Sequence, residues 1–184
     1  GTGGTNNDTP SLSVNSVSVQ ENAGFAVFTV SLSNASALAT TVSLATANGT
    51  ASSPSDYTTA IQVSTNGGTT WATASAATIA AGSTSVLVRV PIVNDGLDEV
   101  NETFTLTATR TAGVTSNASA TGTGTILDND STPVALADTN ATTEDSLVSA
   151  TGVLSNDSDA DGNALTVVGV LAGASGTPSG NVGT

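Results

Sequence analysis

Residues 86–108 read VLVRVPIVNDGLDEVNETFTLTA and place an acidic loop between two alternating runs. Before the loop, Val86 and Val88 begin a series of apolar residues at every second position. After the loop, Phe104 and Leu106 restore the same period of two. This alternation predicts two half-buried β-strands. We therefore expect a rigid hairpin that carries an acidic tip.

The loop gathers four carboxylates within eight residues and contains no Lys or Arg. These side chains, Asp95, Asp98, Glu99 and Glu102, repel one another in water, so we expect a cation among them. Oxygen ligands without His or Cys indicate Ca²⁺ rather than zinc or copper, because Ca²⁺ accepts about 6–8 oxygens in flexible geometry.

The composition limits the partners and the location of the chain. Its 184 residues carry a formal charge of −13, with fifteen acidic residues against Arg89 and Arg110. Two arginines are too few to neutralise the phosphates of a nucleic acid or an anionic membrane, so neither is an expected partner. Because the chain has no Cys, a metal is the expected staple in place of disulfides. The scarcity of Lys and Glu is typical of secreted repeat proteins and favours an extracellular, cell-surface location.

Short alternating runs recur through the first 130 residues, separated by Gly, Asn and Ser turns. About eight or nine such strands at regular spacing predict an all-β, immunoglobulin-like sandwich. A phase slip within 12–21 suggests a bulge in the first strand, and Asn66-Gly67-Gly68 predicts a hairpin turn. The later strands are expected at Phe25–Ser33, Thr41–Ala47, Ile61–Ser64, Thr70–Thr73, Thr78–Ala80, Ser85–Val93, Glu102–Thr109 and Ala118–Leu127.

The chain divides into three parts by composition. Residues 1–10 are polar and glycine-rich, and are expected to be a linker or the tail of a preceding repeat. Residues 11–130 form the predicted sandwich. Residues 131–184 hold strands expected at Pro133–Ala137 and Ala164–Leu171, followed by a Gly/Ser-rich tail. Because a sandwich cannot close with so few strands, we expect the second β unit to be incomplete.

Residues 11–130 resemble the Calx-beta family in a series of motifs that occur in the family's order. The motifs are Val19-Gln20-Glu21-Asn22, Ser55-Asp56-Tyr57, Asn94-Asp95, Glu102-Thr103-Phe104 and Gly124-Thr125-Ile126-Leu127-Asp128-Asn129-Asp130. The resemblance implies a two-sheet sandwich with Ca²⁺ bound at one end, between the loops and the C-terminal acidic residues. It implies the ligands Glu21, Asp56, Asp95, Asp98, Glu99, Glu102, Asp128 and Asp130. These are all the acidic residues between 11 and 130, and one or two calcium sites are expected.

The second unit resembles the cadherin-like or VCBS-type repeats of giant bacterial RTX-type surface adhesins, through Glu144-Asp145 and the run 152–162. Asp157, Asp159 and Asp161 are the metal ligands expected there. They also imitate the start of an EF-hand loop, but Val168 stands where that loop requires a bidentate Glu. Further oxygens are therefore expected from Asp138, Glu144 or Asp145.

Three isolated residues have structural interpretations. Trp71 could be a sugar-stacking platform with Tyr57 nearby, but a single aromatic makes a poor glycan site, and a cap on the sandwich edge is favoured. Arg89 lies out of phase with the neighbouring valines and is expected to face solvent as a guard of an edge strand. Arg110 is expected to pair with a carboxylate.

Enzymatic activity is not expected. The chain has no His or Cys, the usual general base and thiol nucleophile. Paired carboxylates could hydrolyse glycosides, but that reaction needs a cleft with aromatic sugar platforms, and the chain has five aromatic residues in all.

The sequence thus predicts a calcium-binding extender module of a bacterial surface adhesin or extracellular matrix fibre, in which Ca²⁺ rigidifies the junction between units. Its partners would be neighbouring repeats or other copies of itself, with a host or matrix surface contacted through other domains of the parent. The alternative is a filament subunit that polymerises by β-strand donation between copies. A calcium sensor like the regulatory domains of exchangers is less favoured, because the chain has no membrane segment.

Overall fold

A computed structural model describes residues 9–139, 152–167 and 182–183, and in these residues the chain is all-β apart from one short 3₁₀ turn, η1 (Glu21–Ala23). No helix in the described part is long and apolar enough to cross a bilayer. The strands of the first unit are β1 (Leu12–Val14), β2 (Val17–Gln20), β3 (Phe25–Leu32), β4 (Thr40–Asn48), β5 (Gln62–Ser64), β6 (Ala72–Thr73), β7 (Ala76–Ile79), β8 (Ser85–Pro91), β9 (Glu102–Ala112) and β10 (Ser119–Leu127).

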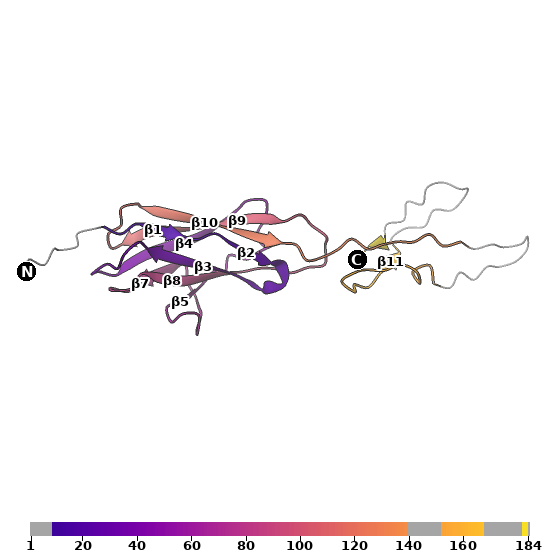
Figure 1. Cartoon of the computed structure of the whole chain (residues 1–184), viewed down its shortest axis with the longest axis horizontal. Helices are drawn as coiled ribbons and strands as arrows, with labels where there is room; N and C mark the ends of the chain where they lie inside the picture. The colour runs from indigo at the N-terminus through magenta and orange to yellow at the C-terminus, as the bar shows by residue number, and fades with distance from the viewer. Residues whose placement is uncertain (1–8, 140–151, 168–181, 184) are drawn as a thin grey trace, which may run out of the picture. The chain divides into compact units, whose positions relative to one another are not determined.

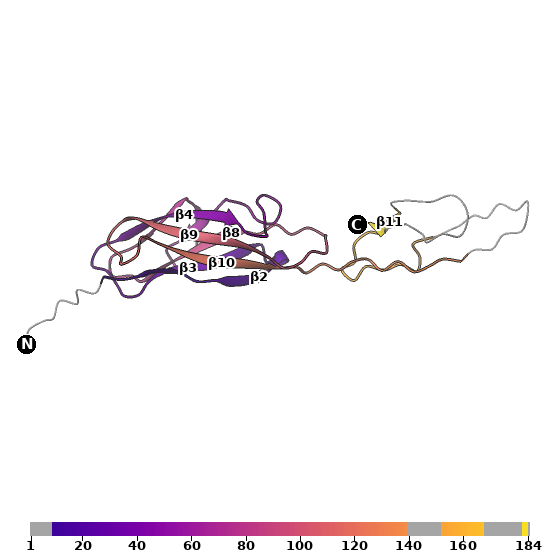
Figure 2. The same ribbon diagram turned by 90° about the horizontal axis from the view of Figure 1, so that it is seen from above.

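These ten strands form two five-stranded sheets that pack face to face, which confirms the predicted immunoglobulin-like sandwich. One sheet, the β3–β8 sheet, has the order β1-β3-β8-β5-β6, and the other, the β9–β10 sheet, has the order β2-β10-β9-β4-β7. Figure 1 shows β9 and β10 in one layer and β3 and β8 in the other. Figure 2 shows β4, β9, β10 and β2 side by side in that order.

The core lies between the sheets and is built from the alternating residues of each strand. Phe28, Val88 and Leu106 are fully buried, in agreement with the period of two in β3, β8 and β9. Phe104 lies at the centre of an aromatic cluster. The Tyr57 ring stacks on it at a centroid distance of 4.5 Å, and the Phe28 ring meets it edge-on at 5.9 Å. Such contacts add about 0.5–1.5 kcal/mol per pair to the burial of the rings.

The predicted hairpin between the two acidic-loop strands is wrong. β8 pairs with β3 and β5, whereas β9 pairs with β4 and β10 in the opposite sheet. The connection over residues 92–101 is long enough to cross the gap of about 10 Å between packed sheets. Alternation located both strands, but the choice of partner strand depends on distant segments.

The phase slip near the N-terminus is not a bulge. β1 pairs with β3, and β2 pairs in parallel with β10, so the chain changes sheets between them. The two linking residues bond one sheet each. The Asn15 N–H donates to the Thr29 carbonyl at 3.3 Å, and Asn15 Oδ1 accepts the Thr29 N–H at 2.6 Å. Ser16 Oγ accepts the Thr123 N–H at 3.0 Å. The predicted hairpin at 66–68 is confirmed, since β5 and β6 pair antiparallel.

The contacts between residues divide the chain into two units. The first comprises Gly1–Asn94 and Val100–Asp128, and the second comprises Asp95–Glu99 and Asn129–Thr184. In the second unit, β11 (Thr166–Val167) pairs with β12 (Val182–Gly183), which the Gly/Ser-rich tail did not predict. Of the strand expected at 133–137, the described residues retain only an isolated bridge between Val134 and Ser158. Residues 168–171 of the other expected strand lie outside the described part.

Gly124 provides a test of the core packing. A Cβ at this position would lie 2.6 Å from two carbons of the Phe104 ring and 3.0 Å from Phe28. Replacing Gly124 with Ala should therefore destabilise the sandwich by about 1–3 kcal/mol through overpacking. Thermal unfolding followed by circular dichroism measures this loss. Thr123→Ala, on the exposed face of the same strand, is the matched control and should change stability much less. An unchanged melting temperature for Gly124→Ala would contradict the packing described here.

Candidate metal centre

Strand register gathers four acidic residues at one end of the sandwich. Gln20, the last residue of β2, lies opposite Leu127 near the end of β10, which places Glu21 and Asp128 together. Glu102 opens β9 opposite Ile126, and Asn48 at the end of β4 lies opposite Phe104. The loop that follows β4 and contains Asp56 therefore leaves from the same end. We call Glu21, Asp56, Glu102 and Asp128 the acidic pole.

The first pair of the acidic pole is Glu21 with Asp128, whose carboxylates offer oxygens within 4.8 Å of each other. Glu21 is the first residue of η1 and only 7% exposed. Asp128 is half-buried directly after β10, and its backbone N–H donates to Asn101 Oδ1 at 3.1 Å. A carboxylate as buried as Glu21 is costly unless hydrogen bonds or a nearby cation stabilise its charge.

The second pair is Asp56 with Glu102, whose oxygens also lie within 4.8 Å of each other. Asp56 Oδ2 accepts the Ser52 N–H at 2.6 Å, so the side chain is held by its own loop. The next residue, Tyr57, is buried in the core, which fixes the loop to the sandwich. Glu102 is positioned by the ladder of β9, and is half-buried.

Several neutral residues that the sequence did not single out fix this end of the sandwich. Asn48 Oδ1 accepts the Tyr57 hydroxyl at 2.6 Å and the Ser53 N–H at 3.2 Å. Gly49 approaches Thr103 so closely that a Cβ would lie 2.4 Å from the Thr103 carbonyl oxygen. An Asn-Gly pair at a strand end signals a turn, but it does not reveal these partners.

Asp95 and Asp98 are not members of either pair, and each has a different role in the loop. Asp95 Oδ1 accepts the Leu97 N–H at 2.8 Å, which closes a tight turn. Asp98 Oδ2 accepts the hydroxyl of Thr132. The second unit includes Glu99 and Asp130, the other two expected ligands of the first 130 residues. Their roles as ligands remain predictions.

The chemistry of the pairs suits calcium. An ion with Ca–O distances of about 2.3–2.6 Å can bind two oxygens that lie within 4.8 Å of each other. Without a cation, two unit charges at that separation repel by about 3 kcal/mol at an effective dielectric constant of about 20. The donors in both pairs are carboxylate oxygens, which favour hard cations.

In the described residues, the predicted aspartates of the second unit belong to no group of three or more acidic residues whose oxygens lie within 4.8 Å of one another. Asp159 Oδ1 accepts the N–H groups of Asp161 and Asn163, at 2.9 and 3.1 Å, whereas its Oδ2 is buried without a hydrogen-bond partner. Asp157 Oδ1 accepts the Leu136 N–H at 2.8 Å. Asp157, Asp159 and Asp161 thus form hydrogen-bonded turns, and their role as metal ligands stays a prediction. Glu144 and Asp145 lie outside the described residues.

The expectations for the isolated residues need correction. Tyr57 is 1% exposed and belongs to the core, so it cannot serve as a sugar platform beside Trp71. Arg110 donates from Nη1 to the Gly113 carbonyl at 2.9 Å rather than to a carboxylate. Arg89 does not guard an edge, because β8 is the central strand of its sheet. The alternation of residues in β8 correctly predicted that Arg89 lies on the outer face of its sheet. It could not predict the order of the strands in that sheet.

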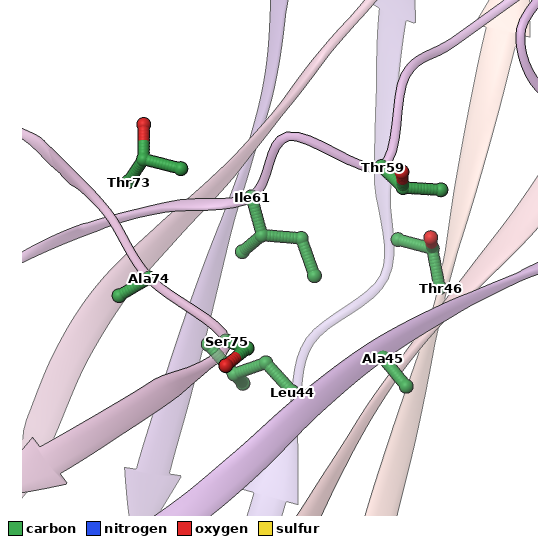
Figure 3. A pocket seen from close by; sticks show the side chains of 8 residues that line it. All are labelled: Leu44, Ala45, Thr46, Thr59, Ile61, Thr73, Ala74 and Ser75. Atoms are coloured by element: carbon green, nitrogen blue, oxygen red, sulfur yellow. The ribbon is translucent and has the colours of Figure 1, made fainter.

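A groove of about 600 Å³ lies away from these acids, between β4 and the segment that leads from β6 to β7. Figure 3 shows Leu44 and Ile61 facing each other across it. Its lining consists of Leu44, Ala45, Thr46, Thr59, Ile61, Thr73, Ala74 and Ser75. These residues offer methyl and hydroxyl groups and no titratable group, so the groove is not part of the candidate metal centre.

A family model described as the Calx-beta domain matches residues 5–140. The chain belongs to the Calx-beta family. A second model, described as a bacterial Ig domain, matches residues 129–184. The finer resemblance of this second part to cadherin-like or VCBS-type repeats, and the giant-adhesin context, remain predictions.

Several solved structures match part of this chain at low sequence identity. The apo-form Calx CBD1 domain matches with a TM-score of 0.48 and 18% identity, over 65% of this chain and 98% of its own. The calcium binding domain CBD12 of CALX1.1 matches with a TM-score of 0.49 and 18% identity, over 65% of this chain and 44% of its own. The E. coli chaperone DraB matches with a TM-score of 0.44 and 11% identity, over 66% of this chain and 57% of its own. The search of curated proteins found no match.

Membership of the Calx-beta family is consistent with the acidic pole, because the family binds calcium. Calx-beta and bacterial Ig domains are commonly extracellular and typically serve as binding or structural modules. The chain is therefore an extracellular-type structural module with acidic groups that could hold a metal.

Glu102→Gln should change the stability of this Calx-beta chain in opposite directions with and without calcium. In EDTA it removes the repulsion with Asp56 and should raise the melting temperature by about 2–4 °C, which corresponds to about 1 kcal/mol after screening. In calcium it should weaken the stabilisation that the native chain gains from the ion. Differential scanning calorimetry in the two buffers measures both effects.

Asp8→Asn is the control for this prediction, because it makes the same change of charge at the one acidic residue of the sequence that is not an expected metal ligand. It should leave the calcium-induced shift unchanged. If Glu102→Gln keeps the full calcium-induced shift, the Asp56–Glu102 pair is not a ligand pair.

Proposed function

We propose that this chain is a calcium-binding extender module, in which Ca²⁺ bound at the acidic pole stiffens the link from the sandwich to the bacterial Ig unit. The observation that carries the proposal is that two carboxylate pairs converge at the end of the sandwich from which β10 leads onward. Asp128 is at once a member of a pair and the last residue of the first unit.

Chain connectivity supports a role for two further carboxylates. Asp130 follows Asp128 by two residues, and therefore lies at most about 7 Å from it between Cα atoms. Glu99 precedes Glu102 by three residues, within about 11 Å. Over both of these Cα separations, two flexible acidic side chains can reach the same ion. We propose that Asp130 joins the Glu21–Asp128 pair and that Glu99 joins the Asp56–Glu102 pair.

A calcium ion held in this way would restrict the segment that starts at Asn129. Without the ion, the segment leaves from a cluster of like charges that favours extended and varied conformations. Binding to the folded chain alone stabilises it by mass action, by about 2.7 kcal/mol at a ligand concentration one hundred times the dissociation constant. A series of such modules would form a rod on a bacterial cell surface or in an extracellular matrix fibre, and would hold an adhesive tip away from the cell.

The proposal predicts that calcium narrows the distribution of the distance between the two units. Spin labels placed by cysteine substitution at Ser43 in β4 and at Thr166 in β11 would report this distance by pulsed electron resonance, since the chain has no native Cys. Adding calcium should sharpen the distribution, and EDTA should broaden it again. Asp130→Asn should reduce the sharpening. An identical distribution in both buffers would contradict the stiffening role, even if calcium still raised the melting temperature.

Strand donation between copies is the second candidate function, and the edge of β4 favours it. β7 pairs with Thr40–Ser43, and the Leu44 N–H donates to the Ser75 carbonyl at 2.8 Å. Beyond this point β4 continues to Asn48 with β9 on one side. By alternation, the backbone groups of Thr46 face the other side, next to the groove of Figure 3. Open edges of this kind accept an added strand.

Thr46→Pro tests this candidate, because proline removes the backbone donor but is tolerated at a strand edge. If copies polymerise by donation to β4, sedimentation should show concentration-dependent polymers that the substitution abolishes. A native chain that stays monomeric at about 1 mM, where even weak association becomes visible, would rule the mechanism out.

A further inference from the structure

One strand pair of the sandwich differs in direction from the others. β2 pairs in parallel with β10 over four register pairs, from Val17 opposite Gly124 to Gln20 opposite Leu127. In the described residues, the other strand pairs of the two sheets are antiparallel. Figure 2 shows β2 beside β10. The parallel pair therefore joins a strand near the start of the sandwich to the strand by which the chain leaves it.

This arrangement determines how tension along the chain reaches the two strands. A pull on the residues before the sandwich enters β2 at Val17, and a pull on the residues after it acts on β10 at Leu127. These two points lie at opposite ends of the overlap between the strands, because Leu127 lies opposite Gln20. The two strands are thus pulled in opposite senses along their own axes. The evenly spaced bonds of a parallel ladder are then loaded together rather than one after another.

Both strands are also anchored to the core. Val17 and Val19 of β2 pack against the buried cluster, and Ile126 of β10 is only 5% exposed. Just before the overlap, Ser16 Oγ accepts the Thr123 N–H at 3.0 Å. To slide β2 along β10, a pull must therefore break these hydrogen bonds and remove two valines from the core in the same step.

β1 precedes β2 on the path of the load. It pairs with β3 over three residues, from Leu12 opposite Leu32 to Val14 opposite Val30. Asn117, which precedes β10, bonds the same strand: its Oδ1 accepts the Leu12 N–H at 2.8 Å, and its Nδ2 donates to the Leu12 carbonyl at 2.9 Å. Once β1 gives way, the load passes to β2.

A carboxylate pair of the acidic pole lies at the far end of the parallel overlap. Glu21 directly follows β2, Asp128 directly follows β10, and their oxygens lie within 4.8 Å of each other. An ion bound by both would join the two strands just beyond Gln20 and Leu127. Without an ion, the two like charges repel each other across the same strands.

We propose that the parallel β2–β10 pair is the mechanical clamp of the sandwich, and that a cation between Glu21 and Asp128 fastens it. The clamp depends on strand pairing and core packing alone. Its fastening by a cation rests on the proposed calcium function. A module built in this way transmits tension between its neighbours without extending.

The clamp is tested by pulling the full chain with optical tweezers in two directions, in EDTA. Handles are attached through paired cysteine substitutions, because the chain has no native Cys. Gly1→Cys with Ser131→Cys pulls β2 and β10 from opposite ends of their overlap and leaves most of the second unit outside the loaded segment. Gly1→Cys with Val114→Cys is the matched control. Val114 is 54% exposed in the turn between β9 and β10, and this turn lies beside the entry of the chain, since the Ser116 N–H donates to the Pro10 carbonyl at 2.9 Å.

In the control direction, both strands are pulled from the same end, so their bonds open in succession. At the same loading rate, the sandwich should unfold at a force at least about twice as high in the Gly1–Ser131 direction, because the four register pairs share the load. Circular dichroism checks that both variants are folded. Equal unfolding forces in the two directions would overturn the clamp.

Calcium tests the fastening in the Gly1–Ser131 direction. Adding calcium should raise the unfolding force, and Glu21→Gln should remove this rise, whereas Asp8→Asn should keep it. Calorimetry in the same buffers separates two failures. If calcium raises the melting temperature but not the unfolding force, the ion does not fasten the clamp. If calcium raises neither, the proposed calcium function fails and the fastening fails with it, whereas the clamp itself is decided by the comparison in EDTA.

Discussion

The stacking of Tyr57 on Phe104 joins the loops that carry the candidate metal centre to the core of the sandwich. Phe104 lies two residues after Glu102, and Tyr57 directly follows Asp56. The same contact that fills the core therefore fixes the two carboxylates of one pair. The Tyr57 hydroxyl extends this network to Asn48 at the end of β4. These contacts hold the backbone segments that carry Asp56 and Glu102 close together.

The distribution of charge follows from this arrangement. In the first unit the acidic residues lie at strand ends and in loops, and the strand faces are left to Ser, Thr and Val. A chain with so few cations cannot neutralise clustered carboxylates by internal ion pairs. A bound divalent ion would supply the missing positive charge. Hydrophobic packing and the backbone hydrogen bonds of the strand ladders stabilise the sandwich, and a metal would stabilise the end at which the chain continues.

Arg89 shows how the same charge imbalance gives a single cation a distinct environment. On a surface rich in carboxylates, an arginine would normally form ion pairs. Here the strand order surrounds it with Phe25, Val27 and Gln62, none of which is acidic. Its guanidinium is held by aromatic contacts, which restrict its orientation without neutralising its charge. The acidic pole and the outer sheet face thus have opposite charges.

The sequence by itself determined most strands of the sandwich, the all-β class and the acids that could bind metal, because period-two alternation and residue type are local properties. Only the tertiary structure decided which strands pair. It placed β8 and β9 in different sheets, moved the chain between sheets at Asn15 and Ser16, and set Arg89 between rings far apart in sequence. It also divided the eight expected ligands of the first 130 residues, by joining Glu21 with Asp128 and Asp56 with Glu102. Pairing and convergence depend on packing between distant segments, and no local pattern encodes that packing.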